Sequence, residues 1–193
     1  ILPYLLGWKL PSDQNFAFDV IVQLGTLLSL ILYFREDIWK LLTSLIQGIK
    51  NRSPFATEEA RLGWYVLLAT IPAGLAGLFL KNKVEAAFDN PALTSFFLFG
   101  TALLLIAAEK IGKKTQTLAE LNWKNVLGIG IFQAISIFPG ISRSGSCLSG
   151  GMIQNFKRED AARFSFWMAI PIMIAAGIMG ILDLFKINEF IQI

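Results

Sequence analysis

Four long apolar stretches constrain this 193-residue chain more than any other feature. They cover residues 16–34, 62–80, 92–108 and 164–185, and each carries at most one charged side chain. An α-helix rises about 1.5 Å per residue, so about 20 apolar residues cross the hydrocarbon core of a bilayer. The sequence therefore predicts four transmembrane helices.

The composition supports a membrane protein. Hydrophobic residues make up 54% of the chain and charged residues 16%, against about 25% charged residues in soluble domains. This balance excludes intrinsic disorder and a nucleic-acid-binding module, and it argues against an ordinary cytosolic enzyme. We expect an all-α, polytopic transmembrane helix bundle that forms a single domain over residues 1–193. Neither end carries a start or processing signal, so we expect an internal piece of a longer protein.

A broken apolar segment at about 125–153 predicts a re-entrant helical hairpin. Its apolar first half, 126–138, stops at Pro139-Gly140, and a weaker apolar half follows a serine-rich turn that contains Arg143. Irregular backbone at membrane depth is tolerated where protein or a wet cavity satisfies it. The alternative is one helix kinked at Pro139. Arg143 argues against it, because a lipid-facing Arg costs about 2.5–3.5 kcal/mol even on the lenient scale.

Basic residues predict the orientation of the chain. The connections 35–61 and 109–124 are rich in Lys and Arg, whereas 81–91 carries two lysines. The positive-inside rule puts the first two connections in the cytoplasm and 81–91 outside, so the hairpin enters and leaves on the cytoplasmic side. Residues 38–49 have apolar side chains at helical spacing and predict an amphipathic helix at the membrane interface.

The turn of the hairpin has the composition of an anion site. Gly140 and Gly145 permit positive φ, a half-helix starting near Ser146 directs N–H groups at the turn, and Arg143 adds a planar guanidinium. We expect phosphate as the ligand, bound by residues that include the hydroxyls of the turn and a glutamine of the first half-helix: Gln133, Gly140, Ser142, Arg143, Ser144, Gly145 and Ser146. Purely structural alternatives stay open: a serine can bond to a nearby carbonyl, and Arg143 can pair with an acid such as Asp19.

Catalytic partners for this phosphate cradle are missing from the sequence pattern. The chain has no histidine and a single cysteine, Cys147. The acidic pairs Glu58-Glu59 and Glu159-Asp160 lie in charged connections, where a solvated surface is the better interpretation. We therefore predict no metal ligands within this chain.

Residues 133–145 and 158–166, with Ile170-Pro171 and an early stretch at 18–26, resemble the undecaprenyl-diphosphate phosphatase, or bacitracin-resistance protein, family. The resemblance implies a bacterial inner-membrane enzyme that removes the terminal phosphate of undecaprenyl diphosphate and recycles the lipid carrier for the cell wall. It also implies an inverted-repeat fold with two hairpins and a site open to the outer side. A homodimer is left open.

In that scheme Arg143 holds the diphosphate, and Ser142 hydrogen-bonds to it or acts as nucleophile. The family's divalent cation, Mg²⁺ or Ca²⁺, would be bound outside this fragment, because the family's glutamate- and histidine-bearing hairpin precedes residue 16. We expect the parent protein to be an enzyme and this piece alone to be inactive. Two alternatives are kept: a lipid-phosphate transporter or flippase that binds the diphosphate without hydrolysis, and a structural membrane subunit.

Overall fold

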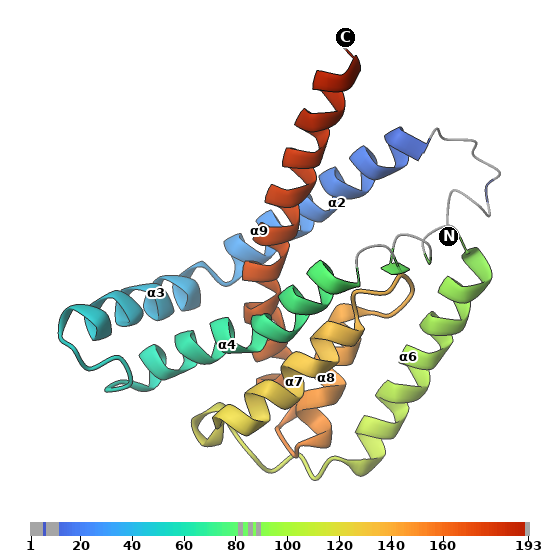
Figure 1. Cartoon of the computed structure of the whole chain (residues 1–193). Helices are drawn as coiled ribbons and strands as arrows, with labels where there is room; N and C mark the ends of the chain where they lie inside the picture. Colours follow the sequence, from blue (N-terminus) through green and yellow to red (C-terminus); the bar gives the residue numbers. More distant parts are fainter. Residues whose placement is uncertain (1–5, 7–11, 81–82, 85–86, 88–89, 192–193) are drawn as a thin grey trace.

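The computed structural model describes the chain apart from residues 1–5, 7–11, 81–82, 85–86, 88–89 and 192–193, and apart from the side chains of 12–21 and 180–191. Regular secondary structure in the described ranges is helical, with one isolated β-bridge between Gln116 and Phe156. The elements are α2 Ser12–Tyr33, α3 Arg35–Lys50, α4 Glu58–Phe79, α6 Pro91–Ile111, η1 Leu118–Glu120, α7 Trp123–Ile135, α8 Arg143–Ile153 and α9 Arg158–Ile191 (Figure 1).

The helices begin at capping residues rather than at the first apolar residue. Thr57 caps α4 by accepting a hydrogen bond from the Ala60 N–H at 3.2 Å. Asn90 caps α6 in the same way through Leu93, and Pro91 occupies the first turn. The polar first turn of α4 therefore begins the helix a few residues before its apolar stretch, because the free N–H groups of a first turn need such partners.

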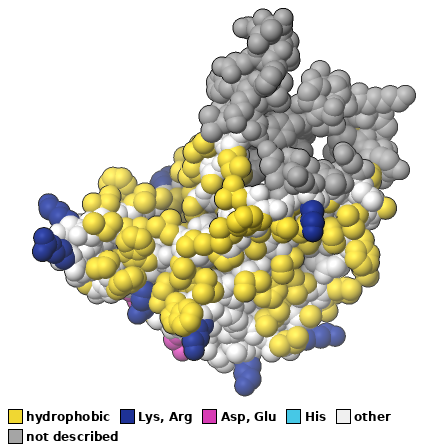
Figure 2. Space-filling view, viewed as in Figure 1, with side chains coloured by type: hydrophobic (Ala, Val, Ile, Leu, Met, Phe, Trp, Pro, Cys, Tyr) yellow, Lys and Arg dark blue, Asp and Glu magenta, His cyan; other side chains and the backbone are white. Residues whose placement is uncertain are grey.

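The surface of the helices suits a lipid environment. Three segments are long and apolar enough to cross a membrane, Glu58–Phe79, Pro91–Ile111 and Arg158–Met179, and Val22–Tyr33 is a shorter apolar helix. Large side chains such as Phe79 and Phe96 are exposed, which is unfavourable in water over so wide an area. Figure 2 shows hydrophobic side chains across one face, with Lys and Arg mainly at its left and lower edges. The predicted all-helical membrane bundle is confirmed.

The predicted hairpin segment forms two short helices joined by a turn. Helix α7 packs on α4, where Gly130 lies against the Ala69 backbone, and α8 contacts α6, α7 and α9 (Figure 1). Helix α8 is therefore surrounded by three other helices. The main core lies between these helices and includes Val126, Ile129, Cys147, Met152, Phe164 and Met168.

Polar contacts tie the two ends of this hairpin together. Asn125 donates to the Gln154 carboxamide at 2.9 Å, and Gln154 donates back to the Asn125 carbonyl at 3.2 Å. Beside them, the Asn155 carbonyl accepts from both Thr115 and Gln116 at 2.9 Å. Because these bonds join the start of α7 to the end of α8, the hairpin begins and ends at one side of the bundle.

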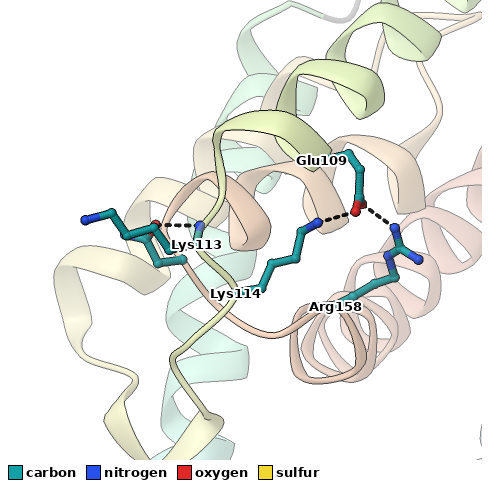
Figure 3. A network of polar contacts seen from close by, with 5 residues as sticks. Glu109, Lys113, Lys114 and Arg158 are labelled. Carbon is teal, nitrogen blue, oxygen red and sulfur yellow. Dashed lines mark hydrogen bonds and ion pairs between the residues drawn. The ribbon is translucent and has the colours of Figure 1, made fainter.

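The charged connections lie at that same side. Glu109 at the end of α6 pairs with Lys114 and with Arg158 of α9 (Figure 3). Arg163 of α9 binds Asp37 of α3 in a bidentate ion pair, with a shortest distance of 2.7 Å. Arg61 of α4 donates to the Ala119 carbonyl at 3.0 Å. The two connections predicted to be cytoplasmic are therefore brought to one end of the molecule.

Asn155 gives a first testable prediction. It has φ of 71°, and its side chain accepts from the Lys113 N–H at 3.0 Å (Figure 3). Asn155→Ala should lower the free energy of unfolding by about 1–2 kcal/mol, since it loses this bond and alanine tolerates the left-handed conformation poorly. Asn155→Gly also loses this bond, but glycine adopts the left-handed conformation without strain, so it should lower the free energy of unfolding by less. Thermal unfolding in detergent measures both, and an alanine variant as stable as wild type would contradict this role.

Candidate functional site

The turn between α7 and α8 is fixed by a close contact with α6. Helix α7 ends at Ile135, three residues earlier than the apolar pattern suggests. Gly140 has φ of 92°, and a Cβ at this position would lie 2.0 Å from the Thr94 carbonyl oxygen of α6. The prediction that Gly140 supplies a positive φ is correct, and the structure adds that no side chain fits there.

Helix α8 begins at Arg143, which corrects the predicted start near Ser146. Ser142 is its N-cap, and its Oγ accepts from the Gly145 N–H at 3.2 Å. Gly145 is therefore helical, and it does not use the positive φ that glycine permits. Its small size serves packing instead, because a Cβ there would lie 3.0 Å from the Thr101 methyl carbon.

Arg143 stands at the first position of α8. The backbone N–H groups of Arg143 and Ser144 make no hydrogen bond to the described residues, as is usual for the first turn of a helix. Within the same part of the chain, no hydrogen bond or ion pair engages the guanidinium. The Asp19 side chain, proposed above as a structural partner, lies outside the described residues. Free N–H donors, a helix N-terminus and a permanent cation together favour an anion.

The remaining predicted residues divide into two groups. Ser144 is exposed, and its Oγ lies 3.5 Å from that of Ser142 at the mouth of the turn. Ser146 and Gln133 are each 1% exposed and lie deeper. The Cys147 thiol donates weakly to the Gln133 Oε1 at 4.0 Å. The structure thus joins Gly140, Ser142, Arg143 and Ser144 in one turn, and it places Gln133 and Ser146 behind them.

Contacts with α6 show how far the turn reaches into the bundle. Met152, at the end of α8, touches Gly112 just after α6, whereas the Ser142 N–H donates to the Thr101 hydroxyl at 3.2 Å. Helix α6 runs from 91 to 111, so Thr101 lies about 15 Å from its end. The turn therefore lies beside the first half of α6, far from the hairpin's base.

Thr101 is a site residue that sequence reasoning missed. Its side chain is 5% exposed, donates to the Phe97 carbonyl at 3.1 Å and accepts from Ser142. A single threonine in an apolar span is ordinary, because it bonds to the preceding turn. Only the packing of α6 on α8 reveals that Thr101 also supports the cap of α8.

The described residues do not fit a divalent cation site. They contain no group of three or more His, Cys, Asp or Glu side chains arranged to hold a metal. The turn offers N–H groups, hydroxyls and a guanidinium, whereas Mg²⁺ and Ca²⁺ take carboxylate and other oxygen ligands. No chemical step of this chain is therefore assigned to a metal.

A separate cleft of about 350 Å³ opens at the charged end of the bundle and includes Asp37, Glu58, Glu59, Asp160 and Arg163 in its lining. Its acids have structural explanations. Glu58, Glu59 and Asp160 lie in helix first turns, and Asp37 pairs with Arg163. This cleft is distant from the α7–α8 turn and is not the candidate site.

Comparisons with known proteins agree with the resemblance stated above. The family described as "Bacitracin resistance protein BacA" matches residues 1–192. The chain is 42% identical over 186 residues to an undecaprenyl-diphosphatase of Myxococcus xanthus, covering 96% of this chain and 62% of the relative.

Two further relatives carry the same name. That of Corynebacterium striatum is 40% identical, over 90% of this chain and 62% of the relative. That of Chloroherpeton thalassium is 38% identical, over 94% and 66%. The chain spans about three fifths of the length of these curated relatives. Taken with the family match, they show that the chain belongs to the bacitracin resistance protein BacA family.

Proposed function

We propose that the full-length protein is an integral membrane phosphatase that hydrolyses undecaprenyl diphosphate to undecaprenyl phosphate and inorganic phosphate. The observation that carries this proposal is the Ser142-Arg143 start of α8 inside a membrane helix bundle. There a guanidinium meets two N–H groups that bond to none of the described residues. The names of the relatives support the same substrate.

The described residues supply part of the proposed hydrolysis, namely the binding of the phosphate oxygens. In the net reaction the oxygen of water bonds to the terminal phosphorus, the bond from that phosphorus to the bridging oxygen breaks, and undecaprenyl phosphate and inorganic phosphate are released. Arg143 and the α8 N–H groups would hold the non-bridging oxygens, whose charge they stabilise. Ser142 Oγ accepts from the Gly145 N–H and lies 3.5 Å from the Ser144 hydroxyl, so its proton would turn from Ser144 to donate to a phosphate oxygen. The choice between this role and a nucleophilic one stays open.

Several expectations belong to the full-length protein. The Mg²⁺ or Ca²⁺ of the resemblance would be held by residues beyond the described ones. We place the protein in the bacterial inner membrane with the α7–α8 turn toward the outer side, because the charged connections gather at the opposite end. The homodimer stays a prediction.

The test is phosphate release by the purified full-length protein from undecaprenyl diphosphate in detergent, with Mg²⁺ or Ca²⁺ present. We expect release that EDTA abolishes and added cation restores. Binding of the same lipid is measured in parallel with a radiolabelled sample.

A transporter is the second candidate, because two short helices meeting at a polar turn are also typical of transporter binding sites. Lipid binding without phosphate release, at any cation concentration, would favour the transporter and contradict the phosphatase. Phosphate release without a divalent cation would contradict the proposed cofactor and leave the proposed phosphatase activity standing.

A further inference from the structure

Behind the turn, three helices bring polar side chains together around Cys147. Gln133 of α7 contacts the thiol through Oε1. Ser165 of α9 lies within reach of the same thiol for a weak O–H···S contact, and no other partner among the described residues satisfies its hydroxyl. Gln133 is 1% exposed, Cys147 0% and Ser165 3%. The three side chains form a polar layer inside the bundle, which we call the Cys147 layer.

Apart from that weak contact with sulfur, two donors of this layer have no partner in the part of the chain that the structure describes. They are the Gln133 Nε2 and the Ser165 Oγ. Because the thiol occupies Oε1, the unpaired end of the Gln133 carboxamide is its N–H₂ group. Buried polar atoms without a partner are unfavourable in an apolar interior. A ligand oxygen that accepts from both groups would remove that penalty.

The layer lies directly behind the predicted phosphate site. Cys147 follows Arg143 by four residues in α8, so the two side chains lie on one face, one turn apart. Hydroxyl and amide N–H groups near a guanidinium suit an anionic oxygen.

We propose that Gln133 and Ser165 form a deeper phosphate-binding subsite, in which both donate to an oxygen of the phosphate group held by Arg143. The subsite rests on the proposed function, because it takes the same phosphate. Ser165 is then a substrate-binding residue, and Gln133 acts with it from α7, since both helices pack against α8.

Ser149 provides a matched control on the same helix. Its hydroxyl is also buried, at 0% exposure, and also has no partner among the described residues. It follows Cys147 by two residues, and about 200° of helical rotation separates the two side chains. Ser149→Ala therefore removes an equivalent hydroxyl on the side of α8 away from the Cys147 layer.

The experiment uses inorganic phosphate as the probe and the full-length protein in detergent. Thermal unfolding is measured with and without phosphate for wild type, Ser165→Ala, Gln133→Leu, Ser149→Ala and Arg143→Ala. We expect Ser165→Ala and Ser149→Ala both to raise the Tm without phosphate, by about 2–4 °C each, because each removes an unpartnered group. Ser165→Ala and Gln133→Leu should weaken phosphate binding about tenfold, whereas Ser149→Ala should leave it unchanged.

The other outcomes separate a failure of the deeper subsite from a failure of the proposed function. Unchanged phosphate affinity in Ser165→Ala and Gln133→Leu, with affinity lost in Arg143→Ala, overturns the deeper subsite and leaves the proposed function standing. Unchanged affinity in Arg143→Ala contradicts the proposed site itself. A lower Tm without phosphate in Ser165→Ala shows that the hydroxyl has a resident partner, such as ordered water, and also overturns the subsite. Ser165→Thr keeps a hydroxyl and should restore the affinity, which separates binding from packing.

Discussion

Arg143→Ala in the full-length protein is expected to lower phosphate release from undecaprenyl diphosphate by about 10²–10³-fold, the usual loss for a single preorganised donor to developing charge. The guanidinium makes no hydrogen bond or ion pair with the described residues. Removing it therefore leaves no buried acid unpaired among them, and the fold should survive. Initial rates of phosphate release measure the effect, and the Tm verifies the fold.

Arg143→Lys keeps the positive charge but loses the planar fork, which binds two phosphate oxygens at once. We expect it to recover only part of the lost rate. Arg52 offers a matched control, because it is an exposed arginine in the α3–α4 connection. Arg52→Ala should release phosphate at the wild-type rate. Wild-type release by Arg143→Ala would show that the α8 start does not hold the substrate.

Much of the architecture could be predicted from apolar length alone. The stretch 92–108 falls within α6, and 62–80 coincides with α4 up to Phe79, with Leu80 as the C-cap. Helix α4 extends back to Glu58 through a polar first turn, and α6 extends to Ile111 through a charged last turn. Hydropathy marks what the bilayer contacts, whereas hydrogen bonding at the caps decides where a helix begins. Because the two signals differ physically, the helix boundaries could not be predicted as well as the helices.

The candidate site was predictable to a similar degree. Gly140, Ser142 and Arg143 could be predicted, because a glycine, a hydroxyl and a guanidinium beside a proline break in an apolar segment together indicate an anion site. The start of α8 was misplaced because Ser142 and Ser146 are equally good N-caps by type, and only the bond to Gly145 distinguishes them. Thr101 and Ser165 could not be found, because the contact of Thr101 with Ser142 and the role proposed for Ser165 depend on helices far apart in sequence.

Gly140→Ala should have the second largest effect. Its backbone has φ of 92°, where a side chain costs about 1–2 kcal/mol. The new Cβ would also lie 2.0 Å from the Thr94 carbonyl oxygen and 2.8 Å from its carbon. A backbone carbonyl inside α6 cannot rotate away, so the turn must move. We expect a loss of more than about 2 kcal/mol in the free energy of unfolding.

The displacement of the turn should also lower the rate of phosphate release. Ser142 and Arg143 follow Gly140 directly, and misplacing a reacting geometry by about 1 Å can cost about 10²-fold in rate. Gly100→Ala is the matched control, because it adds the same methyl group to α6 where no described residue lies within 4 Å. It should leave phosphate release unchanged and should not lower the Tm, because alanine favours a helix interior over glycine. If Gly140→Ala unfolds at the wild-type temperature and releases phosphate normally, the turn is not held against α6, and the Thr101 contact cannot position Ser142.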